Sequence, residues 1–169
     1  MPEPSHLHTL MATLPQQGRV EWVGVRPARG QTMTVLKRVT VSPGLGLEGD
    51  RFRGRTASKR QVTLIQQEHL AVIAACLQSG PLEPALFRRN LVVSGLNLLA
   101  LKGKQFRIGN ALLEYTGLCH PCSKMETILG PGGYNAMRGH GGITARVLEP
   151  GELALGDWVQ SVDWVQSVD

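Results

Sequence analysis

Two cysteines three positions apart are the residues of this sequence best suited to chemistry. Cys119 and Cys122 enclose a His-Pro pair in the segment EYTGLCHPCSKMETILG, which runs from 114 to 130. Such a pair can be a redox dithiol or half of a zinc site, and one member alone can be a nucleophile. Both can also be ordinary loop residues, so the neighbouring sequence has to distinguish four interpretations.

The redox and zinc interpretations fit the surroundings poorly. A thioredoxin-like dithiol follows a strand in a βαβ unit, and the pattern before Cys119 is not of that kind. A structural zinc site needs four ligands, usually in two paired knuckles, and the sequence has no second C-x-x-C and no H-x-x-x-H. The third cysteine, Cys76, falls in an apolar helical stripe, which is more typical of a core residue than of a ligand.

Cys122 as a single working thiol fits better. It follows Pro121 and precedes Ser123 and Lys124, at the predicted start of a short helix. Backbone N–H groups and the lysine would both favour the thiolate, which can attack, carry sulfur or bind a soft metal. Spacing alone supports this interpretation and a loop cysteine without a role equally.

Basic and glycine-rich segments could supply an anion site. The run GPGGYNAMRGHGGITAR lets backbone amides approach an anion closely, although its glycines fit a set of tight turns equally well and lack P-loop spacing. Basic residues also cluster in DRFRGRTASKRQ and at Arg88-Arg89-Asn90. Each cluster alone is typical of a solvated surface. Together they predict a pocket for a small anionic molecule, provided that the fold brings them together.

Composition limits the class of protein. A chain of 169 residues with 42% hydrophobic residues suits one domain with a sizeable core. The net charge of +5 favours an anionic partner, whereas the 5% aromatic content disfavours a nucleic-acid barrel that stacks bases. The sequence has no apolar run long enough to span a membrane and no signal peptide. Its three cysteines are an odd number, which argues against a framework of disulfides. We therefore expect no membrane partner and a reducing, cytoplasmic location.

Periodicity predicts a mainly β, mixed α+β fold. One main helix is predicted over 66–77, where Leu70, Ile73, Ala74 and Leu77 share a face, and a short helix over 123–130. Predicted strands cover 18–27, 33–42, 60–66, 88–95, 105–108 and 111–116, with two more around the turn at 149–151. Seven or so short strands with one main helix and short helical decorations indicate a β-barrel rather than a doubly wound parallel sheet.

The chain divides into three predicted parts. Residues 1–17 form a partly disordered leader, and residues 18–158 form the barrel. Residues 159–169 are expected to be an extension that contains most of a duplication, WVQSVD at 158–163 and again at 164–169. The second copy is expected to pack poorly or to continue an edge strand, because two short copies are too few for a stacked repeat.

The whole pattern resembles a known family. The matching segments, in order, are GLEGDRF, RQVTLIQQE, RRNLVVSGLNL, GKQFRIGNALLEYTGLCHPCSKME and GGYNAMRGHGGITARVLEPGELALGD. On these segments the chain resembles a stand-alone MOSC domain protein, related to the MOSC domain of YiiM-like proteins. The family is named after the C-terminal domain of molybdenum-cofactor sulfurase, and the resemblance covers roughly 18 to 158.

The resemblance implies a β-barrel that binds the molybdenum cofactor (molybdopterin). It also implies a cysteine in a Pro-Cys-x-Lys setting that carries sulfur or ligates molybdenum. That setting maps onto Cys122, as catalytic residue and metal ligand, whereas Cys119 has no match. The other residues that we expect to hold this small anionic cofactor are Arg51, Lys59, Arg60, Arg88, Asn90, Lys124, Arg138, His140 and Arg146.

Two of the candidate polar residues could have purely structural roles instead of a role in binding. Asn90 could equally form a cap or a turn. Asp50 could orient an arginine, act on a bound water or form a loop salt bridge, of which the salt bridge is the simplest.

The family resemblance leaves the reaction open between two activities. The protein would reduce N-hydroxylated compounds with an electron-transfer partner, or carry activated sulfur from a sulfur donor to metal–sulfur centres. The alternative is a non-catalytic module that stores or transfers the cofactor. The sequence shows neither the C-terminal helical extension of YiiM-like reductases nor the aminotransferase-like, pyridoxal-phosphate-associated domain of complete sulfurases.

Overall fold

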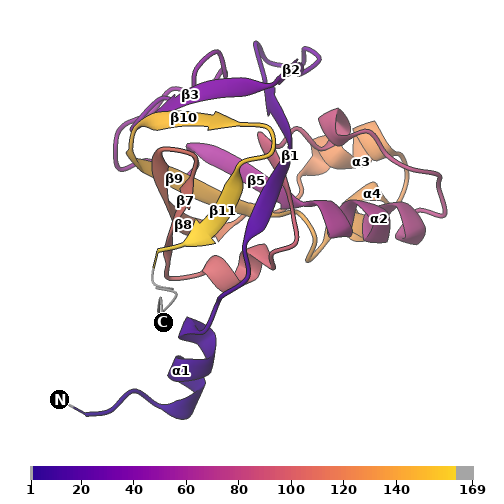
Figure 1. Ribbon diagram of the computed structural model, residues 1–169. Coiled ribbons are helices and arrows are strands. Elements are labelled where there is room, and N and C mark those ends of the chain that lie inside the picture. Colours follow the sequence, from indigo (N-terminus) through magenta and orange to yellow (C-terminus); the bar gives the residue numbers. More distant parts are fainter. Residues whose placement is uncertain (1, 163–169) are drawn as a thin grey trace.

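The computed structural model describes residues 2–162, and its centre is a closed β-barrel (Figure 1). Within those residues the barrel runs in the order β11-β7-β8-β9-β5-β6-β1 and closes where Gly18 of β1 pairs with Val159 of β11. The β5–β6 pair is parallel and the other barrel pairs are antiparallel. The predicted mainly β barrel is thus confirmed. Its strands are β1 (Gly18–Val25), β5 (Val62–Gln66), β6 (Leu91–Ser94), β7 (Gln105–Ile108), β8 (Ala111–Leu118), β9 (Ile143–Glu149) and β11 (Trp158–Ser161).

Four further strands extend this barrel. β2 (Thr34–Leu36) pairs with β1, while β3 (Arg38–Ser42), β4 (Gly46–Leu47) and β10 (Gly151–Ala154) form a three-stranded sheet. The single strand predicted over 33–42 is therefore two strands. It divides at Lys37 because the chain leaves β1 there and pairs next with β10.

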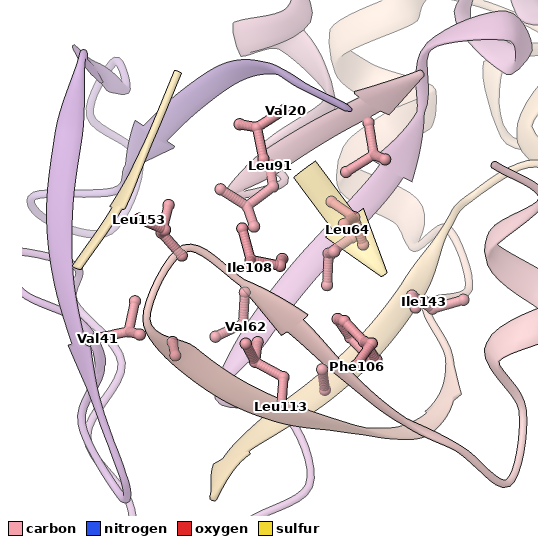
Figure 2. Close-up of a cluster of buried hydrophobic side chains, with 14 of the residues drawn as sticks. Val20, Val41, Val62, Leu64, Leu91, Phe106, Ile108, Leu113, Ile143 and Leu153 are labelled. Atoms are coloured by element: carbon pink, nitrogen blue, oxygen red, sulfur yellow. The ribbon is translucent and has the colours of Figure 1, made fainter. Parts of the chain in front are cut away.

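Alternating side chains fill the barrel. In β7, Phe106 and Ile108 are buried while Gln105 and Arg107 are exposed, as the two-residue period of a strand requires. Figure 2 shows side chains of the barrel strands meeting in the interior, together with Val41 of β3 and Leu153 of β10. Burying each such side chain contributes roughly 1.5–3 kcal/mol. This packed interior fixes the positions of the strand ends, near which the polar residues of the candidate site lie.

A second apolar cluster lies outside the barrel, under the helices. In Figure 1, α2 (Gln67–Cys76), α3 (Ser123–Leu129) and α4 (Gly133–Met137) lie together on one side of the barrel. They cover Ile65 of β5 and Val92 of β6, together with the single-turn 3₁₀ helix η1 (Pro84–Phe87). The cluster contains Ile65, Ile73, Phe87, Val92, Met125, Ala136 and Met137.

Two helical details differ from the sequence prediction. α4 lies in the glycine-rich segment, for which the sequence predicts an anion-binding loop or a set of tight turns, and it forms because Ala136 and Met137 pack into this second cluster. Cys76, expected in the apolar face of α2, is exposed. The buried side of the helix carries Ile73 and Ala74, with Leu77 packed against the cluster, and Cys76 faces away from it.

The N-terminal segment forms a helix that stands away from the barrel (Figure 1). α1 (His6–Ala12) begins at Ser5, whose hydroxyl accepts a hydrogen bond from the His8 N–H. None of its residues is buried, but Leu14 just beyond it joins the barrel core. Lys104 also donates to the Met11 carbonyl at 2.7 Å, so the base of α1 is attached to the barrel.

The C-terminal strand β11 comes from the first copy of the duplicated WVQSVD. Val159 and Ser161 are buried, and β11 joins β7 to β1. The barrel therefore continues beyond the predicted boundary at 158, as far as Ser161. The second copy lies outside the described residues. No helix within 2–162 combines the length and apolar character needed to cross a bilayer.

Candidate functional site

Five arginines and one lysine surround a small cavity that also contains the Cys122 thiol. The cavity has a volume of about 180 Å³, and we call it the arginine pocket. Like charges confined in so small a volume repel one another, so the pocket favours an anionic occupant. It is lined by Arg26, Gly30, Arg51, Arg60, Arg88, Arg89, Cys122, Lys124 and Met125.

Asp50 orients Arg26 at one wall of this pocket. The Arg26 guanidinium donates to both carboxylate oxygens, from Nη2 at 2.8 Å and from Nε at 3.2 Å, and its main-chain N–H donates at 2.8 Å. Asn90 donates from Nδ2 to the same carboxylate and to the Gly24 carbonyl, while its Oδ1 accepts from the Thr63 N–H. Of the roles considered for Asp50, the structure shows that it forms a salt bridge and thereby orients an arginine. The Asn90 side chain holds strands together.

The Asp50 carboxylate is stabilised in its charged form. Burial by itself raises the pKa of this carboxyl. The hydrogen bonds and charge of Arg26, with the Phe52 N–H, outweigh burial, so the pKa of Asp50 lies below its ordinary value. Asp50 is therefore ionised at neutral pH and offsets only one of the six positive charges around the pocket.

Arg89 is a buried cation beneath the pocket. Only 4% of the residue is exposed, and its guanidinium donates to the carbonyls of Gly141, Phe87 and Cys119. Within residues 2–162 no carboxylate forms a salt bridge with it. Burial lowers the pKa of Arg89, but guanidinium groups in proteins remain charged. Its positive charge is therefore available to an anion in the pocket.

Arg88 is held in place by a left-handed backbone. Its φ is 54°, directly after η1, and its Nη1 donates to the Gln31 carbonyl at 2.7 Å. A non-glycine residue in this conformation costs on the order of 1–3 kcal/mol, which the surrounding fold must offset. Burial and then the charges of Arg26 and Arg51 lower the pKa of Arg88. The conformation lets Phe87 pack into the second cluster while the next side chain lines the pocket.

Cys122 is the exposed thiol of the pocket. It lies immediately before α3, whose first turn carries Lys124 and the buried anchor Met125. Cys119 is buried, and its N–H donates to the Gly142 carbonyl at 2.8 Å. Both are free thiols, so no disulfide joins them. Only Cys122 is thus accessible to a molecule in the pocket.

The structure brings together five of the ten residues expected at the site: Arg51, Arg60, Arg88, Cys122 and Lys124. Lys59 is exposed outside the pocket, where its carbonyl accepts a hydrogen bond from the Thr116 hydroxyl. Arg146 forms an ion pair with Glu114, with 2.9 Å between Nε and Oε2. Arg146 lies elsewhere because it points from β9 toward Glu114 of the neighbouring strand β8.

The glycine-rich segment also lies outside the arginine pocket. Arg138 is exposed and donates to Asn135 at 3.4 Å, while His140 lines a different cavity. Two arginines of the pocket, Arg26 and Arg89, were not among the individual residues expected at the site. Arg89 belongs to the basic cluster noted at Arg88-Arg89-Asn90, but a lone arginine at the end of a strand, such as Arg26, carries no local signal.

A neighbouring hollow enlarges the site. It has a volume of about 350 Å³ and shares Gly30, Arg88 and Lys124 with the arginine pocket. Its remaining lining includes Arg29 and the apolar side chain of Ile128. Together the two spaces can accept a molecule with an anionic end and an organic body.

The fold and site define a class, a mixed β-barrel that holds one exposed thiol in a cationic pocket. A family model described as the MOSC domain matches residues 49–160, so the chain belongs to the MOSC domain family.

Solved structures of related shape support the fold. The YuaD protein from Bacillus subtilis superimposes with a TM-score of 0.74 at 19% identity, covering 87% of this chain and 97% of YuaD. YiiM from Escherichia coli gives a TM-score of 0.67 at 23% identity, over 89% of this chain and 72% of that protein. YiiM from Geobacillus stearothermophilus gives 0.67 at 19% identity, over 86% and 75%. No curated protein sequence matches the chain significantly.

Proposed function

We propose that the arginine pocket binds the molybdenum cofactor, with Cys122 as its catalytic thiol and metal ligand. One observation carries the proposal: the exposed thiol of Cys122 lines the same cavity as five arginines and Lys124. Membership of the MOSC domain family is consistent with it. The protein would act in a reducing cytoplasm, where such a thiol persists.

The residues present fit the chemistry of this cofactor. Guanidinium groups bind phosphate through paired, charge-assisted hydrogen bonds, and a thiolate is a soft ligand suited to a sulfur-bound metal. When bound, the cofactor would supply two-electron redox chemistry. Arg60, Arg88 and Arg89 would bind and orient its anionic groups, and the neighbouring hollow beside Ile128 would take the organic part.

Two reactions are compatible with this site. The first is reduction of N-hydroxylated compounds, which needs an electron-transfer partner. The second is sulfur carriage, in which the Cys122 thiolate attacks the outer sulfur of a donor persulfide. The donor then leaves as a thiolate and Cys122 becomes a persulfide. The alternative, a non-catalytic module that stores or transfers the cofactor, requires the arginines but no turnover at Cys122.

The test begins with protein isolated from a host that makes the cofactor. Molybdenum and released pterin are measured in wild type, Cys122→Ala and Cys76→Ser, and thiol mass spectrometry follows incubation with a persulfide donor. Cys76 is exposed and lies outside the pocket, so its variant is the matched control. We expect wild type and Cys76→Ser to retain molybdenum or gain one persulfide at Cys122, and Cys122→Ala to do neither.

The outcomes separate the alternatives. Wild-type protein with neither molybdenum and pterin nor a persulfide refutes the proposal. If wild type and Cys122→Ala bind the cofactor equally, and wild type does not turn over hydroxylamine substrates, the protein is the non-catalytic module instead.

A further inference from the structure

A second cavity lies between α2, the 3₁₀ helix η2 (Leu98–Leu101) and the start of β9. It has a volume of about 380 Å³ and shares no lining residue with the arginine pocket. Small-molecule sites in proteins usually have volumes of roughly 300–1,000 Å³. The cavity is therefore large enough to hold a ligand of its own.

Two histidines meet at this cavity. The ring centroids of His69 and His140 are 4.9 Å apart, with an angle of 62° between the ring planes. The Nδ1 atom of His140 is buried without a hydrogen-bond partner, which is unusual for a buried polar atom. Neither imidazole forms a hydrogen bond with the protein within residues 2–162. Neither ring is thus committed to the fold, and both histidines line the cavity.

The backbone that follows His140 is fixed by two hydrogen bonds. Arg89 donates from Nε to the Gly141 carbonyl at 2.8 Å, and the Cys119 N–H donates to the Gly142 carbonyl at the same distance. Gly142 has a φ of +92°, and a Cβ atom there would collide with the Leu64 carbonyl oxygen. Such a tightly held loop keeps the imidazole in one place.

Hydrogen bonds also fix the wall of the cavity that faces His140. The Gln66 side-chain oxygen accepts a hydrogen bond from the Leu98 N–H at 3.2 Å, which links η2 to the end of β5. Asn97 uses its Oδ1 to accept from the Leu99 N–H, which leaves its Nδ2 as a donor beside the cavity.

The remaining lining has two kinds of surface. Its polar groups are the two imidazoles, the Asn97 amide and the committed Gln66 oxygen, and no Asp or Glu lines it. Its apolar wall is formed by Leu98, Leu99, Leu118 and Ile143, of which Leu99 and Leu118 are 53% and 50% exposed. A complementary ligand accepts hydrogen bonds at one end and presents an apolar body at the other.

We propose that this cavity, which we call the histidine cavity, binds a small organic carboxylic acid. The carboxylate accepts hydrogen bonds from His69 and His140, and an aliphatic or aromatic body lies against Leu99 and Leu118. The site is independent of the function proposed for the arginine pocket.

Binding at this site takes up a proton. Burial lowers the pKa of His69, the nearby His140 lowers it further, and Glu68 opposes the change, so free His69 is uncharged at neutral pH. A bound carboxylate favours the imidazolium form and raises the pKa of His69 in the complex. Affinity is therefore greatest below the pKa of free His69 and falls as pH rises through the pKa of the complex.

Isothermal titration with hexanoate and benzoate tests the proposal. Sulfate is present throughout to occupy the arginine pocket, and EDTA to remove metal ions. We expect binding of both acids, stronger at pH 6 than at pH 8. Hexanol, which has the same apolar body without the charge, should bind about tenfold more weakly or worse.

Variants identify the site. His69→Ala and His140→Ala should each weaken hexanoate binding by about tenfold or more, the loss of one charge-assisted hydrogen bond. His120→Ala, an exposed histidine outside the cavity, should bind as wild type does. Circular dichroism checks folding, and His69→Gln, which keeps a donor, should retain part of the affinity.

Several results would overturn the proposal. One is that neither acid binds measurably, and another is that hexanol binds as tightly as hexanoate. A third is that the affinity for the acids is the same at pH 6 and pH 8, and a fourth is that the histidine variants are folded and bind hexanoate as wild type does. Acid binding that appears only when sulfate or EDTA is omitted would likewise assign the acid to the arginine pocket or to a metal ion.

Discussion

Replacing Asp50 by asparagine should destabilise the protein by about 3 kcal/mol, because the variant leaves the Arg26 charge without its partner. The Asp50 side chain is fully buried and that of Arg26 is 13% exposed. Removing one partner of a buried ion pair costs about 3–5 kcal/mol. The lower end applies because asparagine keeps one acceptor oxygen and Arg26 keeps some contact with water.

The expected loss is large enough to measure by two methods. In a domain of this size, 1 kcal/mol corresponds to a change in melting temperature of roughly 2–4 °C, so Asp50→Asn should melt about 6–12 °C lower. Urea unfolding followed by tryptophan fluorescence should show a lower midpoint with an unchanged slope, since the fold itself is retained.

The pH dependence gives a second, independent check. The pKa of Asp50 is lowered from its ordinary value of 3.8 in the folded protein. Its contribution to stability is therefore complete above 3.8 and is lost as pH falls through the lower folded-state pKa. The stability gap between wild type and Asp50→Asn should narrow in this acidic range.

An exposed ion pair supplies the control. Glu152 lies 3.5 Å from Arg38, and their side chains are 51% and 73% exposed. Glu152→Gln should cost no more than about 1 kcal/mol. The reasoning is refuted if Asp50→Asn lowers the free energy of unfolding by no more than this control does. It is also refuted if the difference in stability between wild type and Asp50→Asn stays constant as the pH is lowered.

Three further substitutions, two of them with a control variant, test the barrel, the glycine loop and the pocket. Val159→Ala should cost about 2 kcal/mol in urea unfolding, since Val159 fills the seam where the barrel closes. Gly142→Ala should cost about 3 kcal/mol or more, because its Cβ meets a main-chain carbonyl of β5. Gly139→Ala shares the positive φ but meets no neighbour, and should cost only about 1 kcal/mol. Arg88→Ala should weaken sulfate binding about tenfold by titration calorimetry, whereas Arg138→Ala, outside the pocket, should not change it.

Local patterns in the sequence predicted most of the secondary structure. Alternation predicted β7 over 105–108, and helical spacing predicted α2 to within a residue at each end. The patterns failed where pairing between distant segments decides the outcome. The strand predicted over 33–42 divides between two partners, and α4 exists because Met137 packs into a cluster that the sequence cannot show.

The same distinction applies to the candidate site. Cys122 and Lys124 were found because they lie in one short motif beside a predicted helix. Arg26 was missed because its place in the pocket depends on Asp50, which lies 24 residues further along the chain. His140 lies among glycines and basic residues in the sequence, yet the fold turns it toward His69.

The sequence by itself determined the mainly β class, the helix over α2 and the single thiol in a Pro-Cys-x-Lys setting. These depend on periodicity and on neighbouring residues, which are local properties of the chain. Only the tertiary structure decided which arginines share a cavity, that β11 closes the barrel, and that the two histidines line a separate cavity. Those features depend on strand order and side-chain direction, and a barrel sets both only when its first and last strands pair.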